Sequence, residues 1–290
     1  MSTVKIQAGR AHTAGNKLSV RKCLIYFVLI IWTFVSLFPV YWMLTFSLKN
    51  NSEIFGANVV GLPHYWAWEN YTRALNTGNM GVYFMNSLII AITSIVFTLV
   101  VAVMATYAMT RLVWKRRETM NKFFMLGLTI PIHAAIVPLY VVLSRVKLLN
   151  SYPALIIPYS AFSLAMAILI STGFMGDIPY DLDEAAFLDG CGVWGIFFRV
   201  IAPLMVPAIS TVGIYTFLQC WNELMFATIF NSKEALKTLP VGIQGLVGQY
   251  STEWGAIGAS LAIATIPTLI VYVLLSKRIQ DSFIAGAVKG

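Results

Sequence analysis

The chain has 290 residues, of which 58% are hydrophobic and only 11% are charged, and its formal net charge is +8. Soluble domains carry about 25% charged residues, so this composition excludes an ordinary soluble domain and indicates a membrane protein. The three cysteines, Cys23, Cys191 and Cys220, have no spacing typical of a metal site, and their odd number does not favour a disulfide framework.

The amino-terminal residues 1–22 are polar and basic and predict a disordered tail. A basic region before an apolar one is also typical of a signal peptide. The apolar run 23–48 is too long for a signal core, however, and no small-residue cleavage site follows it. We therefore interpret this run as a first membrane-spanning helix, with a kink at Pro39.

Five more apolar segments predict further spans, at residues 82–109, 123–144, 152–175, 200–220 and 256–276. The expected fold is thus an all-α membrane protein with six transmembrane helices. Its transmembrane domain covers residues 23–276, and a carboxyl-terminal tail covers residues 277–290. The loop 49–81 contains Tyr65, Trp66 and Trp68, which indicate either an interfacial aromatic belt or a contact surface for an outer partner.

The distribution of Lys and Arg orients the six predicted spans. With the amino terminus in the cytoplasm, the inner segments hold fourteen of the twenty basic residues and the outer loops hold six. Because positive charge favours the cytoplasmic side, both termini are expected to be cytoplasmic. This bias explains most of the net charge and argues against a nucleic-acid partner.

The segment between the fourth and fifth spans, residues 177–203, departs from this bias and is called the elbow below. It holds one arginine and five of the twelve carboxylates, which are Asp177, Asp181, Asp183, Glu184 and Asp189. A carboxylate costs about 2.5–3.5 kcal/mol at a bilayer centre, so the elbow is expected to lie in water. Asp181 is the predicted N-cap of a short helix, with Glu184 completing a capping box. Gly190 and Gly192 are expected to end that helix, and a second helix is expected over 193–203.

Motifs for catalysis are absent from the sequence. It contains no G-x-x-x-x-G-K-[ST], no H-E-x-x-H and no paired-cysteine ligand set, so the chain is not expected to be an ATPase or another enzyme. His133 in the third predicted span is interpreted as a packed, neutral histidine, with a substrate or proton ligand as the alternative. The predicted spans contain no Asp, Glu, Lys or Arg, which argues against a self-powered proton symporter and indicates an external energy source.

The elbow resembles the EAA loop of ABC-importer permeases. That family has EAA, three residues, Gly, about nine residues and then I-x-L-P; here Cys191 and Ala202 stand where Ala and Leu are commoner. The resemblance implies a coupling helix that inserts into a groove of a separate ATPase subunit. The coupling residues that it implies are Asp183, Glu184, Ala185, Ala186, Asp189, Gly190 and Pro203. An ordinary capped amphipathic loop helix is the alternative interpretation.

Further motifs narrow the resemblance to the maltose-type carbohydrate permeases. These motifs are G-A-V-K-G at residues 286–290, W-N-E at 221–223 and T-L-P-V-G at 238–242. This resemblance implies a multi-pass permease in the bacterial cytoplasmic membrane that imports a carbohydrate, or alternatively a polyol phosphate. The implied partners are a second related permease, two cytoplasmic ABC ATPases and an extracytoplasmic sugar-binding protein. The chain itself is expected to bind no cofactor, while ATP and Mg are used by the ATPase. Lys277, Arg278 and Lys289 are expected either to contact that ATPase or to orient and anchor the tail.

A stand-alone channel or an intramembrane enzyme is the alternative from another class. Either would need pore charges or a catalytic constellation, and neither is visible in the sequence.

Sugar rings have apolar faces and a polar rim, so aromatic and amide side chains are the expected contacts along a transport path. The candidates are Asn86, Tyr140, Tyr159, Tyr215, Gln219, Trp221 and Asn222. Tyr215, Gln219 and Asn222 share one face if the fifth helix continues that far. Interhelical hydrogen bonding and belt aromatics are the alternative roles.

Overall fold

The computed structural model describes residues 20–76, 78–248 and 252–287, and all regular structure in these ranges is helical. The long helices are α1 (Val20–Ser47), α4 (Met80–Thr110), α7 (Pro153–Gly176), α11 (Val206–Trp221) and α14 (Trp254–Ala287). The shorter helices are α2 (Asn51–Ile54), α3 (Glu69–Asn76), α5 (Arg117–Leu126), α6 (Ile136–Arg145), α8 (Asp181–Leu188), α9 (Val193–Ile196), α10 (Ala202–Leu204), α12 (Met225–Phe230) and α13 (Leu239–Gly245). Single turns are η1 (Gly127–Thr129), η2 (Ile132–Ala135), η3 (Phe197–Ile201, π-helical) and η4 (Glu234–Leu236).

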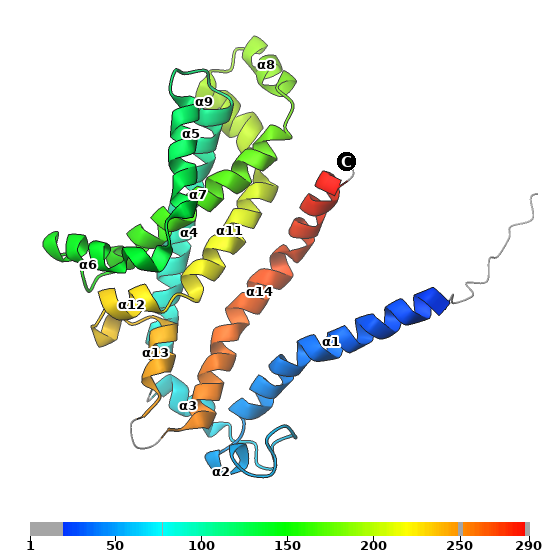
Figure 1. The fold of residues 1–290 in the computed structure, drawn as a ribbon, viewed down its shortest axis with the longest axis vertical. Coiled ribbons are helices and arrows are strands. Elements are labelled where there is room, and N and C mark those ends of the chain that lie inside the picture. The colour runs from blue at the N-terminus through cyan, green and yellow to red at the C-terminus, as the bar shows by residue number, and fades with distance from the viewer. Residues whose placement is uncertain (1–19, 77, 249–251, 288–290) are drawn as a thin grey trace, which may run out of the picture.

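The core of the bundle is formed by α4, α7 and α11 (Figure 1). Small side chains at every third or fourth position of α4 are buried there, among them Ala91, Ser94, Thr98 and Ala102. Small residues let helix backbones approach closely, which is how membrane helices pack where lipid offers no hydrophobic driving force. The sequence of α4 therefore positions α7 and α11 against it along much of its length.

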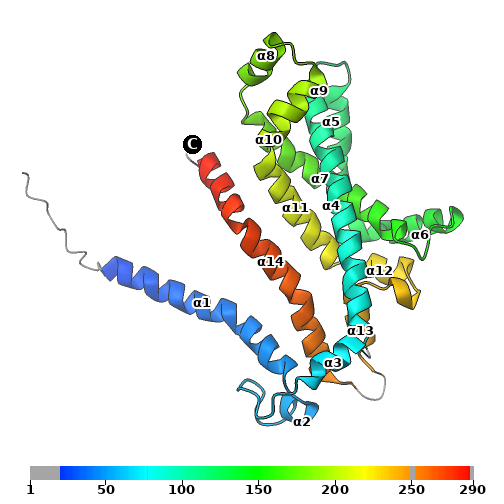
Figure 2. The same cartoon turned by 180° about the vertical axis from the view of Figure 1, so that it is seen from behind.

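Helix α1 diverges from the bundle, and its amino-terminal half lies far from the other helices (Figures 1 and 2). Only Thr45 and Ser47 are buried in its 28 residues. Its contacts with α14 lie near its carboxyl-terminal end, and the apolar side chains before Pro39 are exposed. An apolar surface of this length is suited to a hydrocarbon environment.

Four of the six predicted spans correspond to single long helices, namely α1, α4, α7 and α14. The other two are broken: residues 117–129 and 132–145 meet at 94°, and residues 193–204 and 206–221 meet at 71°. The third and fifth predicted spans are therefore not single straight helices. Ile130 precedes Pro131 and has extended backbone with ψ 119°, because the proline ring disfavours helical geometry in the residue before it. The described residues thus offer four spans, or six if each bent pair crosses once.

After the first break, α6 leaves the bundle on the same side as α12 (Figures 1 and 2). Asn150, at φ 57°, connects the segment after α6 to the segment after α12. Its N–H donates to Phe230 O (2.9 Å), and its Oδ1 accepts from the N–H groups of Ser232 (2.7 Å) and Lys233 (3.0 Å). Asparagine tolerates this left-handed backbone better than most residues. The segment therefore holds its shape through side-chain to backbone bonds.

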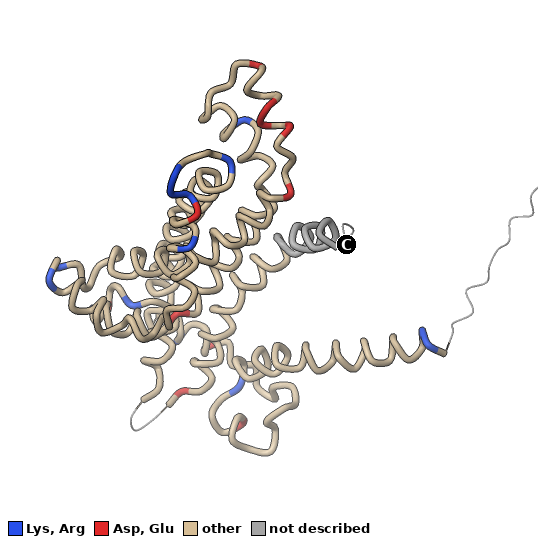
Figure 3. The backbone as a smooth tube through the Cα atoms, turned by 45° about the horizontal axis from the view of Figure 1, so that its top comes forward, with Lys and Arg blue, Asp and Glu red and all other residues tan. Residues whose placement is uncertain are grey.

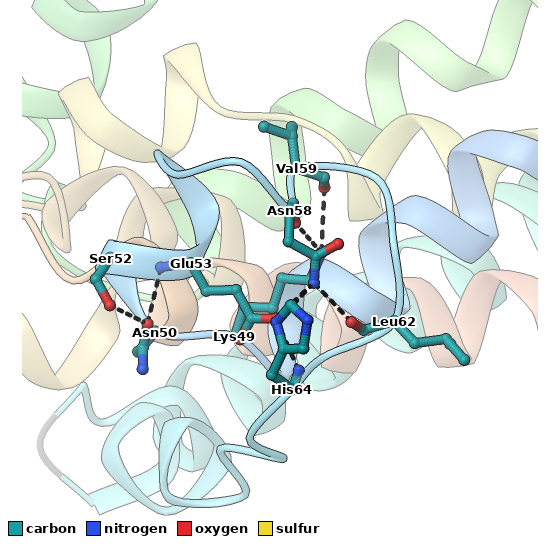
Figure 4. Close-up of polar contacts among 8 residues, drawn as sticks. All are labelled: Lys49, Asn50, Ser52, Glu53, Asn58, Val59, Leu62 and His64. Carbon is teal, nitrogen blue, oxygen red and sulfur yellow. Dashed lines mark hydrogen bonds and ion pairs between the residues drawn. The ribbon is translucent and has the colours of Figure 1, made fainter.

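The loop after α1 is ordered by a buried lysine and a nearly buried glutamate (Figure 4). Lys49 is completely buried, and its Nζ donates to the carbonyl oxygens of Asn58 (2.7 Å) and Val59 (3.2 Å). Glu53 Oε1 accepts from Asn58 Nδ2 (2.7 Å) and from the N–H of His64 (2.8 Å). The Nε1–H of Trp42 donates to Val59 O (3.2 Å), so the loop returns against α1. The belt and the partner-surface interpretations of the exposed rings of Tyr65, Trp66 and Trp68 both remain predictions.

This loop is expected to open in acid. Burial raises the pKa of Glu53, but hydrogen bonds from His64 N–H and the Asn58 amide outweigh it, so the pKa lies below the ordinary 4.5. A carboxyl whose folded pKa is depressed stabilises the fold above its unfolded pKa, and that contribution is lost as the pH falls through the folded value. Amide exchange in residues 50–66, corrected for intrinsic rates, should therefore remain slow above pH 4.5 and accelerate as the pH falls below that value. Glu53→Gln should weaken this pH dependence and Glu69→Gln should preserve it; equal profiles for both variants would contradict the assignment.

Candidate functional site

The elbow forms one end of the bundle, where α8 and α9 lie beyond the end of α4 (Figure 1). Helix α8 begins at Asp181 as its first helical residue, and its N-cap is Tyr180 with φ −68° and ψ −23°. The N–H groups of Asp183 and Glu184 both donate to Tyr180 O (2.9 and 3.1 Å). The predicted capping box is therefore wrong, because the backbone is already helical at Tyr180 and Asp181 lies inside the first turn. Acid in that turn still favours the helix dipole.

The end of α8 was predicted correctly. Gly190 has φ 82°, the N–H of Gly190 donates to Phe187 O (3.0 Å), and the N–H of Cys191 donates to Ala186 O (3.0 Å). This pair of bonds is the Schellman motif, which needs a left-handed residue after the helix and so favours glycine. Gly192, at φ −75°, has no such requirement. The second elbow helix is confirmed as α9, the π-helical turn η3 and α10.

The predicted coupling residues divide into an exposed and a buried set. The exposed members are Glu184, Ala185, Asp189, Gly190 and Pro203. Ala186 is only 8% exposed and packs with Met175, Ile196 and Phe197, so it seats α8 on the bundle, and its role in coupling stays a prediction. Position 186 lies on the side of α8 that packs on α9 and η3.

Asp183 is also turned inward, where it meets Arg111 at the end of α4. Arg111 Nη1 donates to Asp183 Oδ2 (2.9 Å), and Arg111 Nη2 donates to the carbonyl oxygens of Met175 (2.8 Å) and Ile178 (2.6 Å). The exposed fractions of the two side chains are 3% for Arg111 and 17% for Asp183. The guanidinium lies 4.1 Å from the centre of the Tyr180 ring. Figure 3 shows the acidic residues of α8 and the basic residues after α4 at the same end of the bundle. Asp183 is therefore paired within this chain, and its role in coupling stays a prediction.

A cleft of about 420 Å³ separates α8 and α9 from the end of α4, and Glu184 and Phe187 line it. Around it the elbow exposes large apolar side chains: 70% of Phe187, 85% of Leu188 and 61% of Trp194. Exposed rings of this size beside carboxylates mark an interaction surface more than a solvated loop. The arrangement can therefore receive a partner that offers both apolar and basic groups.

Two predicted path residues are engaged inside the bundle. Asn86, near the start of α4, is 3% exposed; its Nδ2 donates to Ala235 O and Lys237 O (both 2.9 Å), and its Oδ1 accepts from Tyr152 (2.8 Å). Trp221 is equally buried, and its Nε1 donates to Ala264 O (3.0 Å). Both residues therefore tie helices together.

Three other path residues share the predicted face of α11. Gln219 Nε2 donates to Tyr215 Oη (2.6 Å), and Gln219 is exposed. Asn222 is exposed as well, and lines a groove of about 480 Å³ between α11, α13 and α14. Tyr140 lies apart on α6, with its ring 6.4 Å from that of Phe230. The structure therefore brings Tyr215 and Gln219 together, places Asn222 directly after α11, and leaves Tyr140 outside the group.

Glu223 was not among the predicted sites, yet it binds the predicted path residue Tyr159. Tyr159 donates to Glu223 Oε2 (2.6 Å), and Glu223 also accepts from the N–H groups of Phe226 (2.9 Å) and Ala227 (3.1 Å). Glu223 thus joins α7 to the start of α12, and only its place in the W-N-E motif drew attention to it. His133 is exposed, with one ring contact to Phe226 at 6.1 Å, so the prediction of a packed histidine is wrong. Within the described residues, no group of His, Cys, Asp and Glu could hold a metal ion.

A family model described as "Binding-protein-dependent transport system inner membrane component" matches residues 99–284, which include the elbow and the α11 face. The chain belongs to this family. It is a multi-pass inner-membrane permease and, as such, a membrane subunit rather than an enzyme.

Several curated permeases are similar to it over nearly their whole length. The sulfoquinovosyl glycerol transport system permease protein SmoH of Agrobacterium fabrum is 36% identical over 254 residues, covering 88% of this chain and 89% of the relative. The trehalose/maltose transport system permease protein MalG of Thermococcus litoralis is 33% identical over 267 residues, covering 90% and 94%. A chain of a solved bacterial ABC transporter for the acidic polysaccharide alginate has a TM-score of 0.79 at 20% identity, covering 90% of this permease and 97% of that chain. The last likeness shows that the permease shares that chain's fold.

Proposed function

We propose that this chain is the permease subunit of an ABC importer for a carbohydrate, driven by ATP hydrolysis in separate ATPase subunits. The observation that carries the proposal is the elbow: a short helix with an exposed carboxylate, Glu184, and exposed rings, fixed to a rigid base by Ala186 and Arg111. A partner that grips α8 would move this base as a unit. Rocking of the spans would then alternate access across the bilayer.

Related proteins support the carbohydrate class and the binding protein. The relatives are named for sulfoquinovosyl glycerol, for trehalose and maltose, and for diacetylchitobiose, the last being NgcG of Streptomyces coelicolor, 32% identical over 261 residues. A second solved alginate transporter, with a TM-score of 0.62, is described in complex with a pentasaccharide-bound periplasmic protein. We extend both properties to this chain, together with a second permease subunit as its partner in the membrane.

We further propose that the elbow faces the bacterial cytoplasm and that α11 lines the sugar path. The bias of fourteen inner against six outer basic residues supports this orientation. Polar side chains on a membrane span usually face the bundle interior or a water-filled cavity. Gln219 and Asn222 are exposed and Tyr215 is half-buried in this single chain, so a path shared with the second permease is the place that suits them.

Glu184→Lys tests the coupling role. In cells that carry the whole importer, we expect the variant to insert normally, to retain less ATPase on purification, and to lower sugar uptake by at least about tenfold, because like charges in an interface cost several kcal/mol. Glu118→Lys, an exposed acid at the start of α5, is the matched control and should behave as the native chain. Normal ATPase retention and uptake in Glu184→Lys would refute the coupling proposal. Uptake of a polyol phosphate in place of sugars would refute only the carbohydrate assignment.

A further inference from the structure

The carboxyl-terminal end of α4 contacts both helices of the elbow, α8 and α9. Arg111, directly after α4, is paired with Asp183 of α8, and Tyr107 in the last turn donates to Val193 O of α9 (3.3 Å). We infer that Arg111 is the positioning residue that locks the coupling helix to α4, so that a displacement of the elbow becomes a displacement of α4. This inference rests on the proposed function of the elbow.

The guanidinium is suited to this role because it binds three acceptors at once, one on α8, one on α7 and one in the turn between them. Nη1 is used by the Asp183 carboxylate, while Nη2 is shared by the carbonyl oxygens of Met175 and Ile178. Arginine has a planar fork of fixed donors, whereas lysine offers one small ammonium group on a flexible stem. A lysine at position 111 would therefore keep the charge and lose the simultaneous contacts.

The end of α7 and the start of α8 both place negative charge beside the Arg111 guanidinium. The carbonyl oxygen of Met175 lies in the last turn of α7, where the helix carries partial negative charge, and Ile178 follows the C-cap Asp177. Asp183 lies in the first turn of α8. The Tyr180 ring covers the guanidinium, and Tyr180 Oη donates to Thr110 O (3.0 Å). The turn between α7 and α8 is thus wrapped around Arg111, and its geometry depends on that side chain.

The opposite end of α4 is tied as firmly as the elbow end. There Asn86 Nδ2 donates to the carbonyl oxygens of Ala235 and Lys237, and Ser87 Oγ accepts from the N–H of Leu239 (2.8 Å). Helix α4 has 31 residues and is about 46 Å long at 1.5 Å per residue. A rigid helix anchored at both ends links the elbow to residues 235–239, next to the groove that Asn222 lines. Arg111 connects the elbow to the carboxyl-terminal end of this helix.

The test measures ATP hydrolysed per sugar transported by the complete importer in vesicles. We expect Arg111→Lys to assemble with the ATPase and hydrolyse ATP, while sugar transport per ATP falls by about tenfold. Asp183→Asn, which keeps the shape of the side chain, should lower the same ratio by a smaller factor. The double variant should lose no more than Arg111→Lys alone, because both changes act on one contact. Arg116→Lys, an exposed change in the same loop, is the control.

The outcomes separate this inference from the proposed function. An unchanged ratio in Arg111→Lys, or losses that multiply in the double variant, would overturn the positioning role even if Glu184→Lys blocks transport. If Arg111→Lys fails to accumulate, Asp183→Asn decides alone, and an unchanged ratio in that variant overturns the inference.

Discussion

Valine in place of Gly190 is expected to abolish sugar uptake, whereas valine in place of Gly192 is expected to leave it close to normal. Space does not distinguish the two sites, because a Cβ added at either glycine would meet nothing within 4 Å. The backbone does: φ is 82° at Gly190 and −75° at Gly192. A left-handed conformation costs an L-residue about 1–2 kcal/mol, and a β-branched side chain is especially unsuited to it. The variant should relieve this strain by unwinding the end of α8.

The measurement is uptake by the assembled importer together with ATPase retention, after insertion of each variant has been checked. Both the Gly190 N–H bond to Phe187 and the Cys191 N–H bond to Ala186 depend on the turn, so its loss should displace the exposed carboxylate and rings of α8. Equal uptake by the two valine variants would show that the position of the coupling helix does not depend on this glycine.

The second large effect is expected from Asn86→Leu, and it should be an effect on stability. The change leaves the carbonyl oxygens of Ala235 and Lys237 and the hydroxyl of Tyr152 without their partner. A buried polar group left unpaired costs about 1–3 kcal/mol, so the loss should reach at least about 3 kcal/mol in total. Thermal unfolding of the detergent-solubilised chain should show a clearly lowered midpoint, and little of the variant should accumulate in membranes.

Asn222→Leu is the matched change on the exposed face of α11. Its Nδ2 bonds only to Leu218 O of the same helix (2.9 Å), so we expect the unfolding midpoint to change little. If Asn222 lines the sugar path, uptake should fall while the chain accumulates normally. A stability loss in Asn222→Leu as large as that in Asn86→Leu would contradict this division of roles.

Local rules of sequence predicted the parts of the elbow that depend on neighbouring residues. Gly190 was found from the break in an acidic helix, and the structure gives the reason in its positive φ. Asp181 was misassigned because a helix cap depends on the backbone angle at which the chain arrives, and Tyr180 arrives already helical. The contact of Arg111 with Asp183 joins residues 72 positions apart, and no spacing rule reports a contact of that range.

The spans show the same limit on a larger scale. Hydropathy located all six apolar segments, and Pro131 marks where one of them bends, but hydropathy does not give the angle of 94° between its two halves. Likewise, Asn86 and Asn222 are the same residue type at the ends of apolar helices. Only their surroundings distinguish them: Asn86 is buried and binds the carbonyl oxygens of Ala235 and Lys237, whereas Asn222 is exposed.

Helix α1 has one further consequence. Because residues 23–38 are exposed in this chain, the fold of the single subunit requires only that they be apolar and sets no condition on the shape of their side chains. Leucine, isoleucine, valine and phenylalanine should be interchangeable there as far as the stability of the single subunit is concerned. Any position in this stretch that proves selective in a saturation scan must owe its selectivity to another molecule. Such a scan would trace on α1 the outline of whatever covers it in the assembled importer.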